Sequence, residues 1–348
     1  MPQSGLRDKD RLVLRTIVEV YLRSGQAVSS GAVHGRGVSD DSPATIRNIM
    51  VKLEQMGYLA QPHASAGRVP TDQGLRFYVK ALLENRSRSQ EEPGPPVEDL
   101  AARPGDFNAL LDGASRILAD GSDSVGFVLS PRVSRINFQH LRFVKIGEAK
   151  VMVILVTTFN MVLTEIVPAR VYFTQAELDR ASQYINQSFA GKSLTTVRDF
   201  LLRDLPRAKS QFDQAYARLM SLLEASVAQE DSEPPLIVQG ASRLVGKFEE
   251  AEQGVLRDLL RNFEEKASLA RLLSDFIALD RVKVLIGDEA NAPQISECTL
   301  ILSPYGDENQ VLGTLGIIGP KRLPYQKIIP LVDRVAAKLS RTISRKFS

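Results

Sequence analysis

The spacing of apolar and polar residues predicts a helical N-terminal region followed by a mixed region of strands and helices. Apolar residues recur every three or four positions over residues 6–23, 43–56 and 72–84, which is the period of an amphipathic helix. A shorter helix is predicted over residues 30–33, before the second of these helices, because serines that can cap it precede it. The N-terminal region therefore reads as four helices.

A short hairpin is predicted between the third and fourth of these helices. Leu59–Gln61 and Arg68–Pro70 can pair as two strands, with the sequence HASAG at the tip. The predicted elements follow the order of a winged helix-turn-helix, which is helix, short helix, glycine-containing turn, longer helix and hairpin. This class of domain places its second long helix in the major groove of DNA.

The helix that follows Ser42 has one apolar face and one polar face. Ser42 is a good N-cap residue, and Pro43 suits the first helical position, where no backbone donor is needed. At about 100° per residue, the apolar positions form one stripe, and small, polar and basic residues form the opposite face. The stripe consists of Ile46, Ile49, Met50, Leu53 and Met56, and the opposite face carries Ala44, Arg47, Asn48, Val51, Lys52 and Gln55.

The polar face predicts direct reading of base edges. Arginine can form two hydrogen bonds with guanine and asparagine can do so with adenine, so Arg47 and Asn48 are the predicted base readers. Ala44 and Thr45 are predicted to lie beside the bases. For Arg47 and Asn48 the alternative role is a phosphate contact or a solvated surface position.

A second set of residues is predicted to hold the DNA backbone. Lys52 lies one turn deeper in the helix and contributes only charge, which suits phosphate. Arg68 is predicted to contact the backbone or the minor groove from the wing. His63 either contacts phosphate or holds the hairpin together. Ser42 and Ser65 complete this predicted set.

The chain changes character after the fourth helix. A proline-rich, polar segment predicts a linker, and strand-like runs on either side of a helical interval predict one sheet domain interrupted by a mostly helical insertion. Helices are predicted over residues 107–119, 175–190, 194–230 with breaks, 248–261, 263–279 and 325–345, and strands over Val125–Leu129, Ile136–Ile146, Val151–Thr157, Met161–Val167, Leu236–Val238, Val282–Gly287, Cys298–Pro304 and Val311–Ile318.

Charge and cysteine content narrow the function classes. Residues 1–84 hold 11 Lys/Arg and 8 Asp/Glu, and the other 264 residues hold 33 of each, so the whole net charge of +3 lies on the segment with the predicted recognition helix. The single cysteine, Cys298, excludes an internal disulfide framework and a cysteine-based zinc site. The first residues carry no apolar segment, so we expect no secretory signal and a cytoplasmic, nucleoid-associated protein.

Three stretches resemble one known family. The segment Ser42–Thr71 closely resembles the signature of the HrcA family, the bacterial heat-inducible transcription repressors. The parts that carry this resemblance are SPATIRN, LEQMG and PHASAGRVPT. QGASRLVGKFEE from Gln239 and IGPKRLPYQKIIPLVDRVAAKLS from Ile318 are similar to its middle and C-terminal regions. The chain departs from the family at several positions: Ser29-Ser30 replaces Gly-Ser, and Lys321, Leu323 and Pro324 stand where Thr, Met and Asp are more usual.

The resemblance implies an α+β multidomain architecture. Residues 1–84 would form a winged helix-turn-helix domain, and residues 85–105 a flexible linker. A GAF-like α/β domain would consist of residues 106–190 and 265–348. The mostly helical insertion, residues 191–264, would be the dimerisation domain, although it could also pack only on its own GAF-like core.

The resemblance also implies a function and partners. The protein would be a homodimeric repressor that binds double-stranded DNA at an inverted-repeat operator of the CIRCE type, upstream of heat-shock chaperone operons of the groE and dnaK/grpE classes. It would need the GroE chaperonin to stay folded. No membrane, cofactor or metal is implied.

Two other function classes have less support in the sequence. A GAF-like domain can hold a small molecule, which would make the protein a ligand-gated regulator, but no nucleotide loop or acidic cluster marks a site. An enzyme would need a catalytic constellation, and the three histidines, His34, His63 and His140, are scattered along the chain. Ser65 and Ser130 lack the sequence context of an activated nucleophile. No catalytic residue is therefore predicted.

Overall fold

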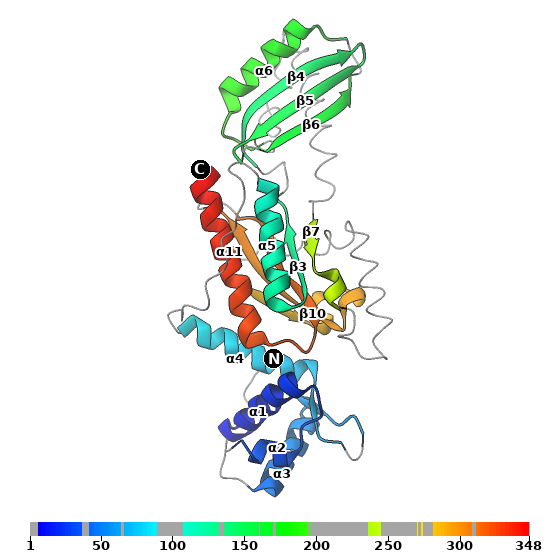
Figure 1. Ribbon diagram of the computed structural model, residues 1–348, viewed down its shortest axis with the longest axis vertical. Coiled ribbons are helices and arrows are strands. Elements are labelled where there is room, and N and C mark those ends of the chain that lie inside the picture. The colour runs from blue at the N-terminus through cyan, green and yellow to red at the C-terminus, as the bar shows by residue number, and fades with distance from the viewer. Residues whose placement is uncertain are drawn as a thin grey trace.

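The computed structural model shows three units stacked along the long axis of the molecule (Figure 1). We call residues 6–71 the N-terminal unit, the five-stranded sheet with its two covering helices the central unit, and residues 136–193 the upper unit. The structure describes residues 6–36, 42–63, 66–88, 107–131, 136–159, 161–169, 172–193, 196, 236–244, 270, 273, 281–307 and 311–347.

The N-terminal unit consists of three helices and a two-stranded antiparallel ribbon. The apolar stripes of the helices face one another, and the glycine Gly25 ends the first helix in a left-handed conformation (φ 72°) that other residues rarely adopt. The elements are α1 (Asp8–Ser24), α2 (Ser30–His34), α3 (Pro43–Gln55), β1 (Leu59–Ala60) and β2 (Val69–Pro70), and α4 (Asp72–Arg88) leads out of the unit. Each was predicted from the sequence to within a few residues.

The central unit is an antiparallel sheet with the strand order β7-β3-β10-β9-β8. Helices α5 and α11 cover one face of this sheet (Figure 1). A second apolar cluster, which contains Phe127, Leu244 and Leu300, covers the other face. The elements are α5 (Phe107–Ser122), β3 (Val125–Leu129), β7 (Leu236–Gln239), β8 (Lys283–Ile286), β9 (Cys298–Gly306), β10 (Val311–Pro320) and α11 (Tyr325–Phe347), with short 3-10 turns η3 (Ala241–Leu244), η5 (Gly287–Ala290) and η6 (Pro293–Ile295).

The upper unit is a separate three-stranded sheet. Among the described strands, β4 (Phe138–Gly147), β5 (Lys150–Thr157) and β6 (Val162–Pro168) pair only with one another, and α6 (Gln175–Phe189) covers one face. They enclose their own core, which includes Phe143, Val153 and Ile185. At its base the chain enters and leaves side by side, since the backbone N–H of Gly191 donates to the carbonyl of Phe138 at 2.8 Å.

This arrangement corrects the predicted boundaries of the insertion. The five-stranded sheet is interrupted after Leu129 and resumes at Leu236, so the predicted start of the insertion at residue 191 is too late, and β7, inside the predicted insertion, belongs to the five-stranded sheet. Residues 106–190 are therefore not one continuous part of the sheet domain. The reason is that alternation predicts a strand with one buried face, but it does not say which sheet the strand joins.

Several predicted segments lie outside the described residues. They are most of the linker 85–105, nearly all of the helical interval 194–230, and nearly all of the helices 248–261 and 263–279. The described part of the chain contains no helix that combines the length and apolarity needed to cross a membrane.

One apolar cluster runs from the N-terminal unit into the central unit. It joins residues of α1 and α3 to residues of α4, α5, β10 and α11. Tyr78 of α4 is 3% exposed within it, and this burial raises the pKa of its hydroxyl to about 12. The hydroxyl therefore stays protonated in the folded protein at a pH where it ionises in the unfolded chain.

This burial should make the joined units sensitive to alkali. The pKa of Tyr78 rises from 10.0 to about 12 on folding, so its contribution to stability is present below pH 10 and is lost as the pH rises through 12. We expect the free energy of unfolding to fall more steeply over this interval in the wild type than in Tyr78→Phe, as measured by denaturant titration. Equal slopes in the two proteins would contradict this account.

Candidate nucleic-acid interface

Helix α3 presents its N-terminal half at the end of the molecule farthest from the upper unit (Figure 1). The hydroxyl of Ser42 accepts a hydrogen bond from the backbone N–H of Thr45 at 3.3 Å, and Pro43 occupies the first turn. Ser42 thus caps the helix as predicted from its residue type. The cap satisfies one backbone donor that no residue within the helix could satisfy.

The two predicted faces of α3 are both observed. Ile46, Ile49, Met50 and Leu53 are buried against the rest of the unit. On the opposite face the side chains are exposed, apart from a half-buried Lys52, and Thr45 at the edge is half-buried. The exposed residues are Ala44, Arg47, Asn48, Val51 and Gln55.

Lys52 has a carboxylate partner within the unit. Its Nζ lies 2.5 Å from Oδ2 of Asp10, whose side chain is only 6% exposed, against 41% for Lys52. The same carboxylate oxygen accepts a hydrogen bond from the backbone N–H of Arg7 at 3.2 Å. Lys52 therefore ties α3 to the first turn of α1, and a phosphate contact would have to share its ammonium group with Asp10. The amphipathic pattern of α1 marks Asp10 as one polar residue among several and does not reveal this partner.

Removing this ammonium group should destabilise the fold. We expect Lys52→Ala to lower the free energy of unfolding by about 1–2 kcal/mol, because a buried carboxylate loses its partner while the pair itself is partly screened by solvent. Denaturant titration of the full chain measures this change. Adding Asp10→Asn should recover part of the loss, since no charge then stays buried without a partner.

Lys80→Ala is the matched control. Lys80 pairs with Glu84 on the surface of α4, and the two side chains are 50% and 53% exposed, so the expected change is below about 0.5 kcal/mol. A loss for Lys52→Ala no larger than that of the control would show that the pair with Asp10 does not hold α3 in place.

Arg68 of β2 is also held within the unit. Its Nη2 and Nε lie 2.9 and 3.0 Å from Oε2 of Glu54, and its side chain is 15% exposed. Its backbone pairs with that of Val28, with N–H to carbonyl distances of 2.8 and 2.9 Å. Arg68 therefore joins the ribbon to the end of α3 and to the turn before α2. Glu54, which was not among the predicted site residues, sets the position of this guanidinium group.

The ribbon β1–β2 is closed by backbone contacts at its tip. Leu59 lies opposite Pro70 and Ala60 opposite Val69. The carbonyl of His63 accepts from the N–H of Ala66 at 2.8 Å, and the His63 side chain is exposed. Ser65 lies outside the described residues, so its predicted contact stays a prediction.

Gly67 is the residue of the ribbon whose importance the sequence did not reveal. A Cβ atom at this position would overlap the backbone of Val28 and Ala27. The ribbon can therefore approach the turn before α2 only if residue 67 has no side chain. The signals in the sequence were its position beside the predicted contact Arg68 and its place in the PHASAGRVPT stretch.

Other site types have less support. Among the residues that the structure describes, no three His, Cys, Asp or Glu side chains come together as metal ligands would. His34 lies in α2, His63 in the ribbon and His140 in β4 of the upper unit, so the histidines are in separate elements.

Together these features define an α+β protein that presents a capped helix with an exposed polar face at one end. A family model described as "HrcA protein C terminal domain" matches residues 108–329. The chain belongs to the HrcA family.

Similar proteins cover nearly the whole chain. A heat-inducible transcription repressor HrcA of Xanthomonas euvesicatoria pv. vesicatoria is 37% identical over 335 residues, which are 96% of this chain and 95% of that protein. The repressor of the same name from Geobacter sulfurreducens is 36% identical and covers 98% of this chain and 99% of its own length. A solved structure described as a hypothetical protein has the same fold, with a TM-score of 0.63, 21% identity, and coverage of 98% of this chain and 100% of that one.

Proposed function

We propose that this protein is a heat-inducible transcription repressor that binds double-stranded DNA through its N-terminal unit. In this proposal the unit is a winged helix-turn-helix, α3 is the recognition helix and β1–β2 is the wing. The observation that carries the proposal is the exposed polar face of α3, which lies opposite an apolar stripe whose Ile46, Ile49, Met50 and Leu53 are buried. The relatives named as heat-inducible transcription repressors support it.

Within this interface we assign base reading to the first turns of α3. Arg47 and Asn48 are exposed there and carry the donor and acceptor groups that recognise guanine and adenine. Ala44 and Thr45 would lie against neighbouring bases. The backbone contacts are assigned to Ser42, Lys52, His63, Ser65 and Arg68. For Lys52 and Arg68 this role requires phosphate to share a group that already pairs with a carboxylate.

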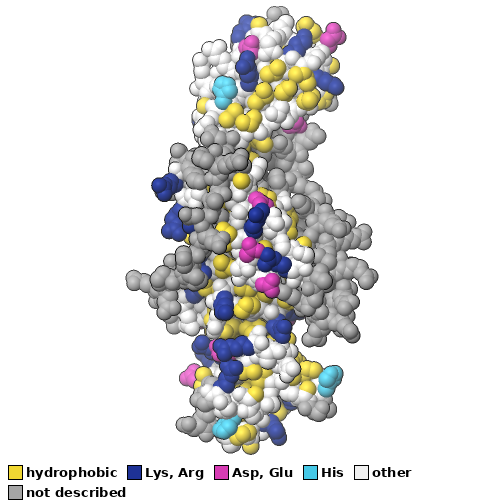
Figure 2. Space-filling model, viewed as in Figure 1, with side chains coloured by type: hydrophobic (Ala, Val, Ile, Leu, Met, Phe, Trp, Pro, Cys, Tyr) yellow, Lys and Arg dark blue, Asp and Glu magenta, His cyan; other side chains and the backbone are white. Residues whose placement is uncertain are grey.

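The repressor is proposed to act as a homodimer on an inverted repeat. A single helix-turn-helix contacts too few base pairs to select one site in a genome, whereas two half-sites multiply the discrimination. The face of the upper sheet opposite α6 offers a surface for the second copy, since it carries exposed apolar side chains (Figure 2). These are Ile146, Val162 and Ile166, which are 41%, 64% and 56% exposed.

We place the operator upstream of heat-shock chaperone operons of the groE and dnaK/grpE classes, as a CIRCE-type repeat. The central unit is proposed to be a GAF-like domain without a cofactor. The protein would act in the cytoplasm, on the nucleoid. GroE chaperonin is proposed to refold the repressor after heat, because a marginally stable dimer unfolds readily and misfolds when unassisted.

A footprint tests the DNA-binding proposal. The purified full chain is added to DNA from upstream of its host's chaperonin operon, and cleavage protection is mapped. We expect protection of an inverted repeat, and we expect this protection to be lost when the sequence of either half is scrambled. Protection without sequence preference, or none at all, would refute the assignment as a sequence-specific repressor.

Recovery of DNA binding after heating tests the role proposed for the chaperonin. The full chain is heated until it no longer binds DNA, cooled, and assayed for binding with and without purified GroE and ATP. We expect binding to return chiefly with chaperonin. Full recovery without it would contradict this part of the proposal.

A further inference from the structure

The C-terminal family stretch, residues 318–340, has no part in the DNA interface. In the structure its residues 319–333, which we call the joint segment, connect the end of β10 to the first turns of α11. Figure 1 shows this connection beside α4 and the N-terminal unit. Its position raises the question of what it does for a DNA-binding protein.

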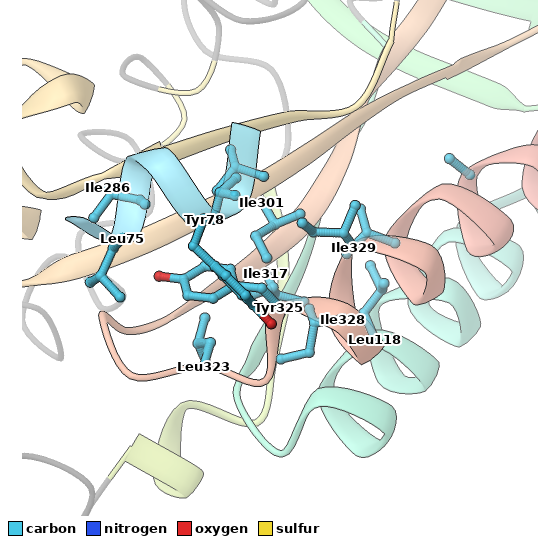
Figure 3. Packing of buried hydrophobic residues seen from close by; sticks show 14 of the residues in the cluster. Leu75, Tyr78, Leu118, Ile286, Ile301, Ile317, Leu323, Tyr325, Ile328 and Ile329 are labelled. Atoms are coloured by element: carbon cyan, nitrogen blue, oxygen red, sulfur yellow. The ribbon is translucent and has the colours of Figure 1, made fainter. Parts of the chain in front are cut away.

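Apolar side chains of α4 and of the joint segment fill the boundary between these two elements. Figure 3 shows Leu75 and Tyr78 of α4 pointing toward Leu323 and Tyr325 of the joint segment. These four side chains are at most 3% exposed, and they belong to one continuous cluster. The hydroxyl of Tyr325 donates to the carbonyl of Lys321 at 2.7 Å, which holds the segment in a tight turn under α4.

Ion pairs cross the same boundary. Nζ of Lys321 lies 3.0 Å from Oδ2 of Asp72 on α4 and 3.1 Å from Oε2 of Glu297. Burial lowers the pKa of Lys321, but its hydrogen bonds to these two carboxylates outweigh the burial and raise the pKa above its ordinary value. The ammonium group is therefore charged and held between two carboxylates, one from each side of the boundary.

Two arginines of α4 form further ion pairs with carboxylates outside α4. Nε of Arg76 lies 2.6 Å from Oε1 of Glu289, and Nη2 of Arg86 lies 3.1 Å from Oδ2 of Asp333. The pairs are spread along the length of α4. Lys and Arg side chains, with carboxylates among them, gather at this level of the molecule in Figure 2. Rotation of α4 on the central unit would break several of these contacts together.

The joint segment also fits closely against α1. A Cβ atom on Gly25, which ends α1, would overlap the guanidinium group of Arg322. On the other side, a Cβ atom on Gly287 would overlap the carboxylate of Asp72. Both glycines have positive φ, at 72° and 59°, a backbone conformation that glycine adopts more readily than other residues.

From these contacts we infer that the joint segment is the docking surface for the N-terminal unit and that Lys321 is a positioning residue for DNA binding. The docked α4 holds α3 in one direction relative to the rest of the chain. In a dimer this sets the spacing of the two recognition helices, so that both half-sites are engaged at once. The inference rests on the proposed function, because only an inverted repeat requires that spacing.

The DNA test compares whole and half operators. The first probe is an inverted repeat that the wild-type full chain selects from random duplex DNA. The second is the same repeat with its spacer lengthened by about 5 bp, or half a helical turn, and the third is one half-site alone. We expect Lys321→Ala to bind the whole repeat about tenfold more weakly and the half-site within about twofold of the wild type, because the advantage of linking two sites depends on their geometry. The variant should also discriminate less against the lengthened spacer.

Three variants frame this test. Lys321→Arg keeps a cation between the two carboxylates and should restore binding of the whole repeat. Lys327→Ala removes a charge of the same sign from an exposed position in the same segment and should leave all three affinities unchanged. Arg86→Ala breaks a separate contact across the boundary and should act like Lys321→Ala. Unchanged or tighter binding of the whole repeat by Lys321→Ala, or an equal loss on all probes, would overturn the positioning role.

A measurement without DNA separates this inference from the proposed function. Spin labels are attached in the full chain at two exposed positions, Val51→Cys on α3 and Arg341→Cys on α11, and the distance between the two labels is measured. The native Cys298 is buried. Labelled protein is diluted with unlabelled protein so that the distances are those within one chain. We expect one narrow distance distribution in the otherwise wild-type chain and a broader one with Lys321→Ala. Equal distributions would overturn the docking inference even if the protein binds its operator, and failure to select any repeat would refute only the proposed function.

Discussion

Arg47→Ala is expected to weaken binding of the inverted repeat by about 1–3 kcal/mol per half-site, or roughly 5- to 150-fold. The side chain is exposed on the first turns of α3, where its guanidinium group can form two hydrogen bonds with one guanine. Losing these bonds should also relax the preference at one base position. Titration of the full chain with the repeat, and with each single-base change in one half-site, measures both effects.

Arg15→Ala is the control for the loss of a positive charge. Arg15 is 47% exposed on α1, where it pairs with Glu19, and it lies outside α3 and the wing. Its replacement should leave the base preference unchanged. If Arg47→Ala weakens specific and random DNA by the same factor, Arg47 contacts phosphate, and its assignment as a base reader is wrong.

Tyr325→Ala is expected to lower the free energy of unfolding by about 3–5 kcal/mol, the range typical of removing a buried aromatic ring. The ring is fully buried at the boundary between the N-terminal and central units. Its hydroxyl lies 3.0 Å from that of Thr299 and donates to the carbonyl of Lys321. Denaturant titration followed by circular dichroism measures the loss.

Two other variants separate the ring from its hydroxyl group. Tyr325→Phe keeps the ring and should cost about 1 kcal/mol, because only the hydrogen bonds are lost. Tyr172→Ala removes a ring that is 63% exposed and contacts Lys145, with an expected cost below about 1 kcal/mol. If Tyr325→Ala cost no more than Tyr172→Ala, the boundary would not be a packed core.

Much of the fold follows from local patterns. The period of apolar residues placed every described helix and strand longer than four residues within a few positions of its observed ends, and Ser42 caps α3 as its residue type predicts. The strands β4, β5 and β6 were predicted as strands but not as a separate sheet. Alternation reports that a strand buries one face, and the partner strand is a contact between distant residues.

Some features of the candidate site could likewise be predicted from local patterns in the sequence, and others could not. The exposure of Arg47 and Asn48 follows from their place opposite the apolar stripe of α3. The partner of Lys52 does not, because Asp10 is 42 positions away and looks like any polar residue of an amphipathic helix. The same holds for Lys321, which the sequence marks only as a departure from the family stretch, and whose two carboxylates come from α4 and from the segment before β9.

By itself the sequence determined the element types, the two faces of α3 and the family, because these depend on residues close together in the chain. Only the tertiary structure decided that Lys52 and Arg68 are tied to carboxylates, that the upper sheet stands apart, and that the C-terminal stretch receives α4. Those features arise from residues brought together from distant parts of the chain, and hydrophobic burial and charge pairing across such distances leave no periodic signal in the sequence.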